Sequence, residues 1–281
     1  VVKYNEKKYF LPTFSKIKIT ETEDVGNDEF ERNFKYIQEV PNGVPSTIKD
    51  WSLDFQKVFG NNATLAMGFA FASLMRDYIF NRYDCFPLLN LFGPAGSGKT
   101  FMARAITCLY GIPQRPIHAV SGTISSFFRK VAQARNANSW YDEYSEKVPD
   151  PKLEGFKNFF DGFGRSLSKL SKDNKTQNTP VHSSVIISGQ VLPNRDPALL
   201  ERCVTLYFTE KKVTKAQTQR ADKFTDAGKK GFYSQIAAQI HALRPHIIDT
   251  FDEMVETTSD HLIGMFNNFN KPSTRVLNNF S

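Results

Sequence analysis

The 281-residue chain contains few cysteines and histidines, and these residues are scattered. Its three cysteines, Cys85, Cys108 and Cys203, are odd in number and lack the spacing of metal ligands. We therefore expect a reducing, cytoplasmic setting in which each cysteine is a small buried side chain. The five histidines are also dispersed, so the sequence predicts no zinc site.

The chain also lacks long apolar runs and a leader-like start. Its longest apolar run, 63–75 (ATLAMGFAFASLM), is followed by Arg76 and Asp77 and is too short to span a bilayer. We expect it to belong to a core helix over about 63–80, and we expect no membrane partner. Residues 1–10 are charged and mixed, unlike a signal peptide. Since the first residue is Val1 and not Met, we expect a segment of a longer protein.

The charge balance is basic but does not identify a partner. The net charge of +7 comes from 36 basic and 29 acidic side chains. Such a surplus is compatible with a polyanionic partner, and it is equally common on a solvated surface. The length suits one large domain or one domain with appendages.

The most informative stretch is GPAGSGKT at 93–100, which satisfies the pattern G-x-x-x-x-G-K-[ST]. An apolar, strand-like run (88–92) precedes it, and a helix-like run (102–110) follows it. Its glycines let backbone N–H groups turn inward, and the helix that begins near Lys99 directs its positive dipole end to the same place. We therefore expect a nucleoside triphosphate to bind the loop residues Gly93, Pro94, Ala95, Gly96, Ser97, Gly98, Lys99, Thr100 and Phe101.

Within that loop, two side chains have specific chemical roles. Lys99 can reach the β- and γ-phosphate oxygens, and the Thr100 hydroxyl can ligate the magnesium that accompanies them. Two acids, Asp142 and Glu143, follow a predicted strand over 137–141 (ANSWY). The first acid would hold magnesium and the second would orient the attacking water. The strand is unusually polar, and the alternative is an acidic surface turn in YDEYSE.

A polar residue at the end of the next apolar strand, 184–188, would lie beside the γ-phosphate, because ligands of open α/β sheets bind at the carboxyl ends of the strands. Gln190 is the first candidate for this sensor, and Ser188 is the second. Further on, DPALLERCVTLYF (196–208) predicts a short helix and a strand. Arg202, between them, could stabilise developing phosphoryl charge across a subunit boundary. An ion pair or a solvated helix end is the competing role, and for Arg195 it is equally favoured.

A basic segment separates the acids from the sensor strand. Arg165, Lys169, Lys172 and Lys175 follow one another at spacings of four, three and three. On a helical turn or a hairpin they could form one positive edge, which would contact phosphates without reading the base sequence. The alternative is an ordinary solvated loop.

The order GPAGSGKT, YDE, VIISGQ and DPALLERCVTLYF resembles the AAA+ type of P-loop ATPase over about 51–208. In particular, it is similar to the helicase-like domains of primase-helicase and replication proteins of phages, plasmids and other mobile elements, related to superfamily 3. The resemblance implies a three-layer α/β P-loop fold with ATP and Mg²⁺ as cofactors. It also implies that Asp142 and Glu143 form the Walker B site, Gln190 is the first sensor and Arg202 is the arginine finger. A hairpin before the sensor touches DNA in such helicases, which assigns the 165–175 segment to single-stranded DNA.

The resemblance therefore implies the ATP-hydrolysing motor domain of a replicative DNA helicase that moves along single-stranded DNA. An arginine finger that acts in trans requires an oligomer, so we expect a homohexamer, with primase or other replication domains in the longer chain. Two other functions remain open: an ATP-dependent loader or scaffold that unwinds nothing, and a small-molecule kinase. The lack of an arginine-bearing substrate lid near 220–230 argues against the kinase. The expected regions are a β-rich extension (1–50), a helical collar (51–85), the ATPase core (86–210) and a helical region (211–281).

Overall fold

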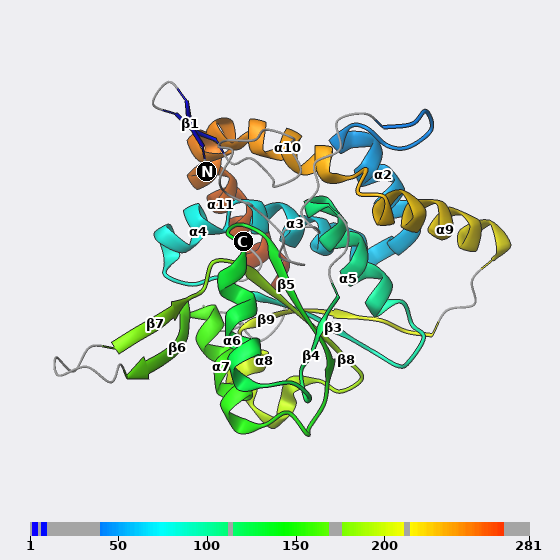
Figure 1. Cartoon of the computed structure of the whole chain (residues 1–281). Helices are drawn as coiled ribbons and strands as arrows, with labels where there is room; N and C mark the ends of the chain where they lie inside the picture. The colour runs from blue at the N-terminus through cyan, green and yellow to red at the C-terminus, as the bar shows by residue number, and fades with distance from the viewer. Residues whose placement is uncertain are drawn as a thin grey trace, which may run out of the picture.

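The computed structural model describes residues 2–4, 7–9, 40–111, 115–168, 176–210 and 214–266. Its centre is a five-stranded parallel sheet with the strand order β4-β5-β8-β3-β9 (Figure 1). The strands of this sheet are β3 (Leu88–Phe92), β4 (Ile117–His118), β5 (Asn138–Tyr144), β8 (Ser184–Gly189) and β9 (Cys203–Tyr207). The strand β3, which leads into the glycine-rich loop, therefore lies between β8 and β9.

The predicted strands 88–92 and 184–188 are confirmed, and their composition explains their central place. All six residues of β8 are buried, as are the first four of β3. Apolar runs of this kind form strands that are covered on both faces, which is the usual environment of a parallel sheet. The one amide in β3, Asn90, donates a hydrogen bond of 3.3 Å to the Thr205 hydroxyl on β9.

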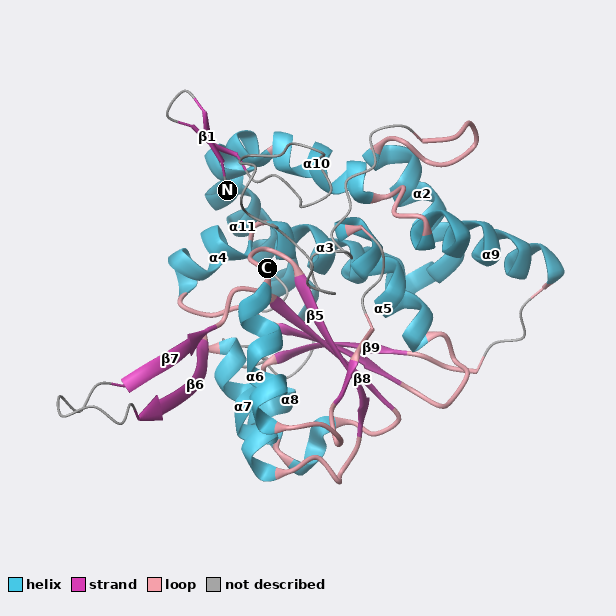
Figure 2. Cartoon of the chain, viewed as in Figure 1, coloured by secondary structure: helices cyan, strands magenta, loops and turns pink. Residues whose placement is uncertain are grey.

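Helices cover both faces of the sheet (Figure 2). The helices are α2 (Ile48–Phe59), α3 (Ala63–Leu74), α4 (Arg76–Tyr83), α5 (Lys99–Thr107), α6 (Ile124–Gln133), α7 (Asp150–Phe160), α8 (Pro197–Leu200), α9 (Lys215–Lys229), α10 (Ser234–Ala242) and α11 (Arg244–Phe266). One buried apolar cluster joins α2, α3, α5, α9 and α10 to the sheet, and a second cluster joins α6 and α7 to its opposite face. The predicted three-layer α/β fold is therefore confirmed.

The expected helix over 63–80 is wrong in one respect, because it is broken at Met75. After that residue, α4 turns by 85° from the helical segment that precedes it. The break buries Arg76, whose guanidinium lies over the Phe80 and Phe86 rings at 5.0 and 5.7 Å. In the described part of the chain, no single helix has the length and apolar composition of a membrane span; the bent pair 48–74 and 76–83 meets those two measures together.

Two antiparallel strand pairs lie outside the central sheet. The first pairs β1 (Val2–Tyr4) with β2 (Lys7–Tyr9). The second pairs β6 (Phe163–Ser168) with β7 (Thr176–Pro180), stands between α7 and β8 in the chain, and projects from the body of the molecule (Figure 2). Of the basic segment 165–175, residues 165–168 belong to β6, and residues 169–175 lie outside the described residues.

The base of the β6–β7 pair is anchored on α4. Arg76 Nη1 donates a hydrogen bond of 2.8 Å to the carbonyl of Val181, which follows β7. On the other side of the base, Gly162 packs so closely on Phe80 that an added Cβ would lie 2.2 Å from the ring. Two side chains of α4 therefore contact the two segments that flank the base of the pair, Gly162 before β6 and Val181 after β7.

Candidate functional site

The glycine-rich loop joins β3 to α5, and two of its glycines are required by geometry. Gly98 adopts φ 100°, a left-handed conformation that favours glycine, immediately before the first turn of α5. At Gly93 the constraint is space, because an added Cβ would lie 2.2 Å from the Phe208 carbonyl oxygen. A backbone hydrogen bond of 2.7 Å from Phe208 to Phe92 fixes that close approach.

Lys99 is directed into the loop. Its side chain is buried, and Nζ donates hydrogen bonds to the carbonyls of Gly93 (2.8 Å) and Pro94 (2.6 Å). Burial lowers the pKa of Lys99, and the nearby Asp142 carboxylate opposes that shift by stabilising the charged form. The first of the two acids lies at the same edge of the sheet, because Asp142 accepts a hydrogen bond from Ser188, which pairs with Leu91 of β3 just before the loop.

The two acids lie within β5 and not in a separate surface turn. The strand was expected to end before Asp142, but it continues to Tyr144 through a register shift in its pairing with β8. Glu143 sits in this bulge with φ 60°, a conformation that costs a residue with a side chain about 1–3 kcal/mol. The bulge leaves the Glu143 side chain 70% exposed, and His118 Nδ1 lies 3.0 Å from its Oε2 atom.

The polar composition of β5 is explained by buried hydrogen bonds between strands and helices. The Asn138 amide donates to Ser73 on α3 (2.9 Å) and to Ser184 on β8 (2.6 Å). The Ser139 hydroxyl is 2.7 Å from that of Ser183. Because buried polar groups are costly unless they are paired, these serines and the asparagine depend on one another.

The two sensor candidates occupy different places. Ser188 is fully buried, and its hydroxyl donates a hydrogen bond of 2.6 Å to Asp142 Oδ1. Gln190 is exposed and directly follows Gly189, whose carbonyl accepts a hydrogen bond of 3.4 Å from Gly93. Ser188 therefore contacts the acid, and Gln190 follows the residue that is hydrogen-bonded to the start of the glycine-rich loop.

Both candidate arginines have partners in their own chain. Arg202 donates to the Ala198 carbonyl (2.9 Å), pairs with Asp161 at 3.3 Å, and leaves 14% of its side chain exposed. Its carbonyl accepts a hydrogen bond from Leu88 at the beginning of β3, so it lies at the end of the sheet opposite the glycine-rich loop. Arg195 donates to the Glu146 carbonyl (2.7 Å) and pairs with Asp150, and it is 41% exposed. In the single chain both arginines make the ion pairs that were their alternative role.

Of the four basic residues assigned to nucleic acid, only Arg165 has a described side chain. It lies on β6 and is half-buried. Lys169, Lys172 and Lys175 lie outside the described residues, so their assignment stays a prediction.

The donors near the loop fit magnesium. Within the described ranges there is no group of three or more His, Cys, Asp or Glu side chains that could hold a metal by themselves. Asp142 and Thr100 would supply one carboxylate and one hydroxyl. That small oxygen set suits Mg²⁺, which keeps several waters and takes further ligands from phosphates.

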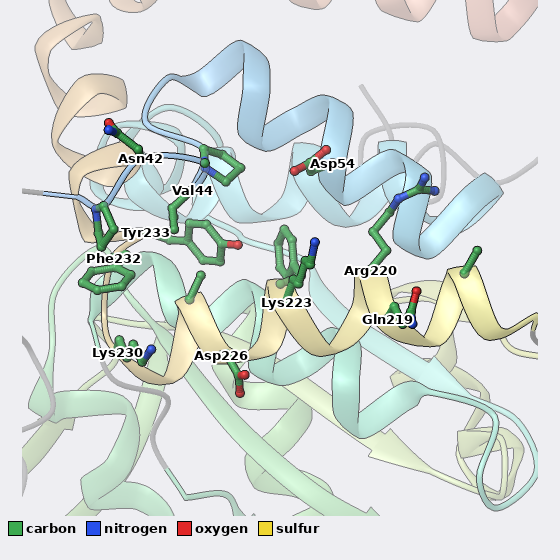
Figure 3. A pocket seen from close by; sticks show the side chains of 16 residues that line it. Asn42, Val44, Asp54, Gln219, Arg220, Lys223, Asp226, Lys230, Phe232 and Tyr233 are labelled. Atoms are coloured by element: carbon green, nitrogen blue, oxygen red, sulfur yellow. The ribbon is translucent and has the colours of Figure 1, made fainter.

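A separate cavity of about 700 Å³ lies between the segment 41–45, α2 and α9 (Figure 3). Its wall includes the cations Arg220, Lys223 and Lys230 and the acids Asp54 and Asp226. No residue of the glycine-rich loop lines it. The charges are mixed, so the wall as a whole selects neither an anion nor a cation.

Three residues that hold the strands around Asp142 and Glu143 were not singled out from the sequence: His118, Trp140 and Lys152. Lys152 is fully buried and donates to the carbonyls of Ala119, Val120 and Ser121 at 2.9–3.1 Å, which fixes the segment after β4. Trp140 Nε1 donates a hydrogen bond of 2.7 Å to Ser188. One signal was present in the sequence. The predicted strand 137–141 contains polar residues and the predicted strand 184–188 contains serines, which indicates hydrogen bonds between the two strands.

Comparisons with known proteins identify the fold. No family model and no curated protein matches the chain. Among solved structures, it is similar to the active helicase Cch of SCCmec type IV, with a TM-score of 0.54 and 13% identity over 82% of this chain. It is also similar to the JCV helicase, with a TM-score of 0.41 and 12% identity over 76% of this chain and 64% of that one. The chain spans 43% of the Cch protein. At this level of identity the likeness concerns the fold, and the chain has the α/β fold of helicase-like P-loop domains.

Proposed function

We propose that this chain is the ATP-hydrolysing motor domain of a replicative DNA helicase of the primase-helicase type, which translocates on single-stranded DNA. The observation that carries the proposal is the combination of two features, one at an edge of the central sheet and one in the segment that leads into β8. Asp142 accepts a hydrogen bond from Ser188 on β8, the strand that pairs with β3 and whose Gly189 carbonyl accepts from Gly93, so the acid lies at the edge of the sheet that holds the glycine-rich loop and Lys99. The projecting β6–β7 pair directly precedes β8 in the sequence, and β8 ends beside this loop. The strand order and the similarity to the Cch helicase support an AAA+ type of ATPase.

The loop residues would bind the phosphates of ATP through their N–H groups, and Lys99 would exchange its carbonyl partners for phosphate oxygens. Thr100 and Asp142 would hold Mg²⁺, which supplies positive charge against the charge on the phosphate oxygens. Glu143 would orient the attacking water by accepting a hydrogen bond from it. Gln190 would contact the γ-phosphate.

Arg202, or else Arg195, would act on the nucleotide of a neighbouring subunit in a homohexameric ring. To do so, the guanidinium would leave Asp161 or Asp150 and stabilise phosphoryl charge across the boundary. Arg195 is the more exposed of the two and would need the smaller rearrangement. Primase or other replication domains of a mobile element would belong to the same longer chain.

The β6–β7 pair would carry Arg165, Lys169, Lys172 and Lys175 to the DNA backbone. Contacts of lysine and arginine with phosphates give affinity that does not depend on base sequence, which suits a translocating motor. The anchoring of this pair by Arg76 and Phe80 supports a mechanical role, because force on the pair would be passed to α4.

The test is the steady-state ATPase activity of the purified chain with and without single-stranded DNA, in the wild type, Lys99→Ala and Lys169→Ala/Lys172→Ala. We expect DNA to stimulate turnover, Lys99→Ala to abolish it, and the double variant to keep basal turnover while losing the stimulation. If Lys99-dependent turnover is insensitive to DNA, the helicase proposal is wrong and the loader or scaffold ATPase takes its place.

A further inference from the structure

A chain of two hydrogen bonds connects Trp140, Ser188 and Asp142. Trp140 and Ser188 are almost fully buried on the neighbouring strands β5 and β8. The indole Nε1 lies 2.7 Å from Ser188 Oγ, and Ser188 Oγ lies 2.6 Å from Asp142 Oδ1. Both distances lie at the short end of the normal range for hydrogen bonds of their type.

The direction of both hydrogen bonds follows from the chemistry of the donors. An indole nitrogen can only donate, so the Ser188 oxygen must accept from Trp140. The single hydroxyl proton of Ser188 then points to Asp142, whose carboxylate oxygens accept. Phenylalanine at 140 would keep an aromatic ring in most of this space but could not donate, and the Ser188 oxygen would lose its donor.

The effect on Asp142 is to occupy one of its two oxygens. Oδ1 accepts from Ser188 and also from the backbone N–H of Glu143, at 2.9 Å. Among the described residues, no hydrogen bond reaches Oδ2. Two donors on one oxygen hold the carboxylate in one orientation and leave the other oxygen for a further ligand.

We propose that Trp140 is a positioning residue for the metal-binding carboxylate of Asp142 and acts through Ser188. We call the chain of hydrogen bonds from Trp140 through Ser188 to Asp142 the relay. The effect of the relay on magnesium binding rests on the proposed function, whereas the relay itself is observed in the contacts of the three side chains. Removal of a hydrogen bond that orients a metal ligand lowers the affinity of the site for the metal about 10- to 100-fold.

The experiment uses the full chain with Trp140→Phe, Ser188→Ala and the double variant, and it measures ATP turnover against Mg²⁺ concentration. Each single variant should raise the Mg²⁺ concentration for half-maximal turnover by about 10-fold, with the KM for ATP unchanged at saturating Mg²⁺. The double variant should shift it no further, because both substitutions break the same relay. An unchanged Mg²⁺ requirement in Trp140→Phe, or additive shifts, would overturn the inference.

A matched control separates the relay from packing. Ile186 is the residue of β8 that pairs with Trp140, and it is fully buried. Ile186→Val removes a methyl group from the same region without touching a hydrogen bond of the relay. It should lower stability slightly and leave the Mg²⁺ requirement unchanged; a shift equal to that of Trp140→Phe would assign the effect to packing.

A spectroscopic readout tests the relay without turnover. The chain has two tryptophans, and the Nε1 atom of the other, Trp51, has no hydrogen-bond partner among the residues that the structure describes. In Trp51→Phe, Trp140 is therefore the single tryptophan and can be excited selectively over the ten tyrosines. Mg²⁺ added with ADP should change its emission, and adding Ser188→Ala should remove the response. In the metal-free protein, Ser188→Ala should move the indole N–H resonance of Trp140 upfield. If the wild type has no Mg²⁺-dependent turnover, the proposed function fails, and this resonance alone decides the relay: an unmoved signal would refute it.

Discussion

His118 Nδ1 lies 3.0 Å from Glu143 Oε2, so the last residue of β4 holds the second acid of β5. Both side chains are more than half exposed, at 52% and 70%. The backbone also joins the two strands here, because Ala119 N–H donates to the Asp142 carbonyl at 2.7 Å. The contact keeps the Glu143 carboxylate at β4, where it competes with any role in orienting water.

His118→Ala should raise basal ATP turnover, because Glu143 would no longer be held at β4. An exposed polar contact of this kind contributes up to about 1 kcal/mol, which limits the increase to about fivefold. The measurement is steady-state turnover without DNA. His246→Ala, an exposed histidine on α11, is the matched control and should leave turnover unchanged. A decrease in His118→Ala would instead show that the histidine helps Glu143 to act.

The steric argument at the loop predicts different outcomes for two glycines. Gly93→Ala would place a Cβ 2.2 Å from the Phe208 carbonyl oxygen, and such overpacking costs about 1–3 kcal/mol or more. The Cβ of Gly96→Ala would contact no other atom, and the substitution should cost about 1 kcal/mol of stability because of the left-handed φ of 72° at this position. Thermal unfolding and titration with a fluorescent ADP should show the larger loss of both stability and binding for Gly93→Ala. Equal losses would contradict the close packing of β3 and β9 at this point.

The buried polar seam between β5, β8 and α3 should be important for stability. Asn138→Leu removes the donor to two buried serine oxygens, and we expect a loss of about 1–3 kcal/mol in the free energy of unfolding. Asn90→Leu removes a single hydrogen bond of 3.3 Å and should cost less than about 1 kcal/mol. Urea unfolding measures both values. If Asn138→Leu is neutral or stabilising, the seam does not require a polar residue.

Asp196 should make stability depend on acid pH. The hydrogen bond from Lys157 lowers the pKa of this carboxyl, which also caps α8 by accepting from Ala198 and Leu199. Since the folded-state pKa is lowered, the stabilisation is complete above the ordinary value of about 3.9 and is lost as the pH falls through the folded-state pKa. Asp196→Asn cannot titrate, so its deficit in the free energy of unfolding should be about 1 kcal/mol or less at pH 7. That deficit should stay constant down to about pH 5 and shrink below about pH 4.

The control for this prediction is Asp196→Ala, which loses the cap as well as the charge. It should cost about 1 kcal/mol more than Asp196→Asn at pH 7, because the asparagine oxygen can still accept from the backbone of α8. Urea unfolding of both variants and the wild type across the pH range provides the measurement. A deficit of Asp196→Asn that grows toward acid pH would have the wrong sign for this ion pair.

The glycine-rich loop and its flanks could be predicted from the sequence because the information is contiguous. The strand 88–92 matches β3 at both ends, and α5 begins at Lys99, as expected. A buried strand, a left-handed glycine and a helix start depend on neighbouring residues and on local backbone preferences. The second buried strand, 184–188, was predictable for the same reason.

Only the tertiary structure decided what the site residues touch. Ser188 reaches Asp142 across 46 positions of sequence, and Arg202 reaches Asp161 across 41. These contacts follow from which strands are neighbours, and local propensity does not specify that order. The left-handed bulge at Glu143 likewise arises from the pairing of β5 with β8. The sequence by itself therefore determined that a phosphate-binding loop exists and where it lies, whereas strand pairing determined the partners of each acid, sensor and arginine, because those hydrogen bonds join positions that only the folded sheet brings together.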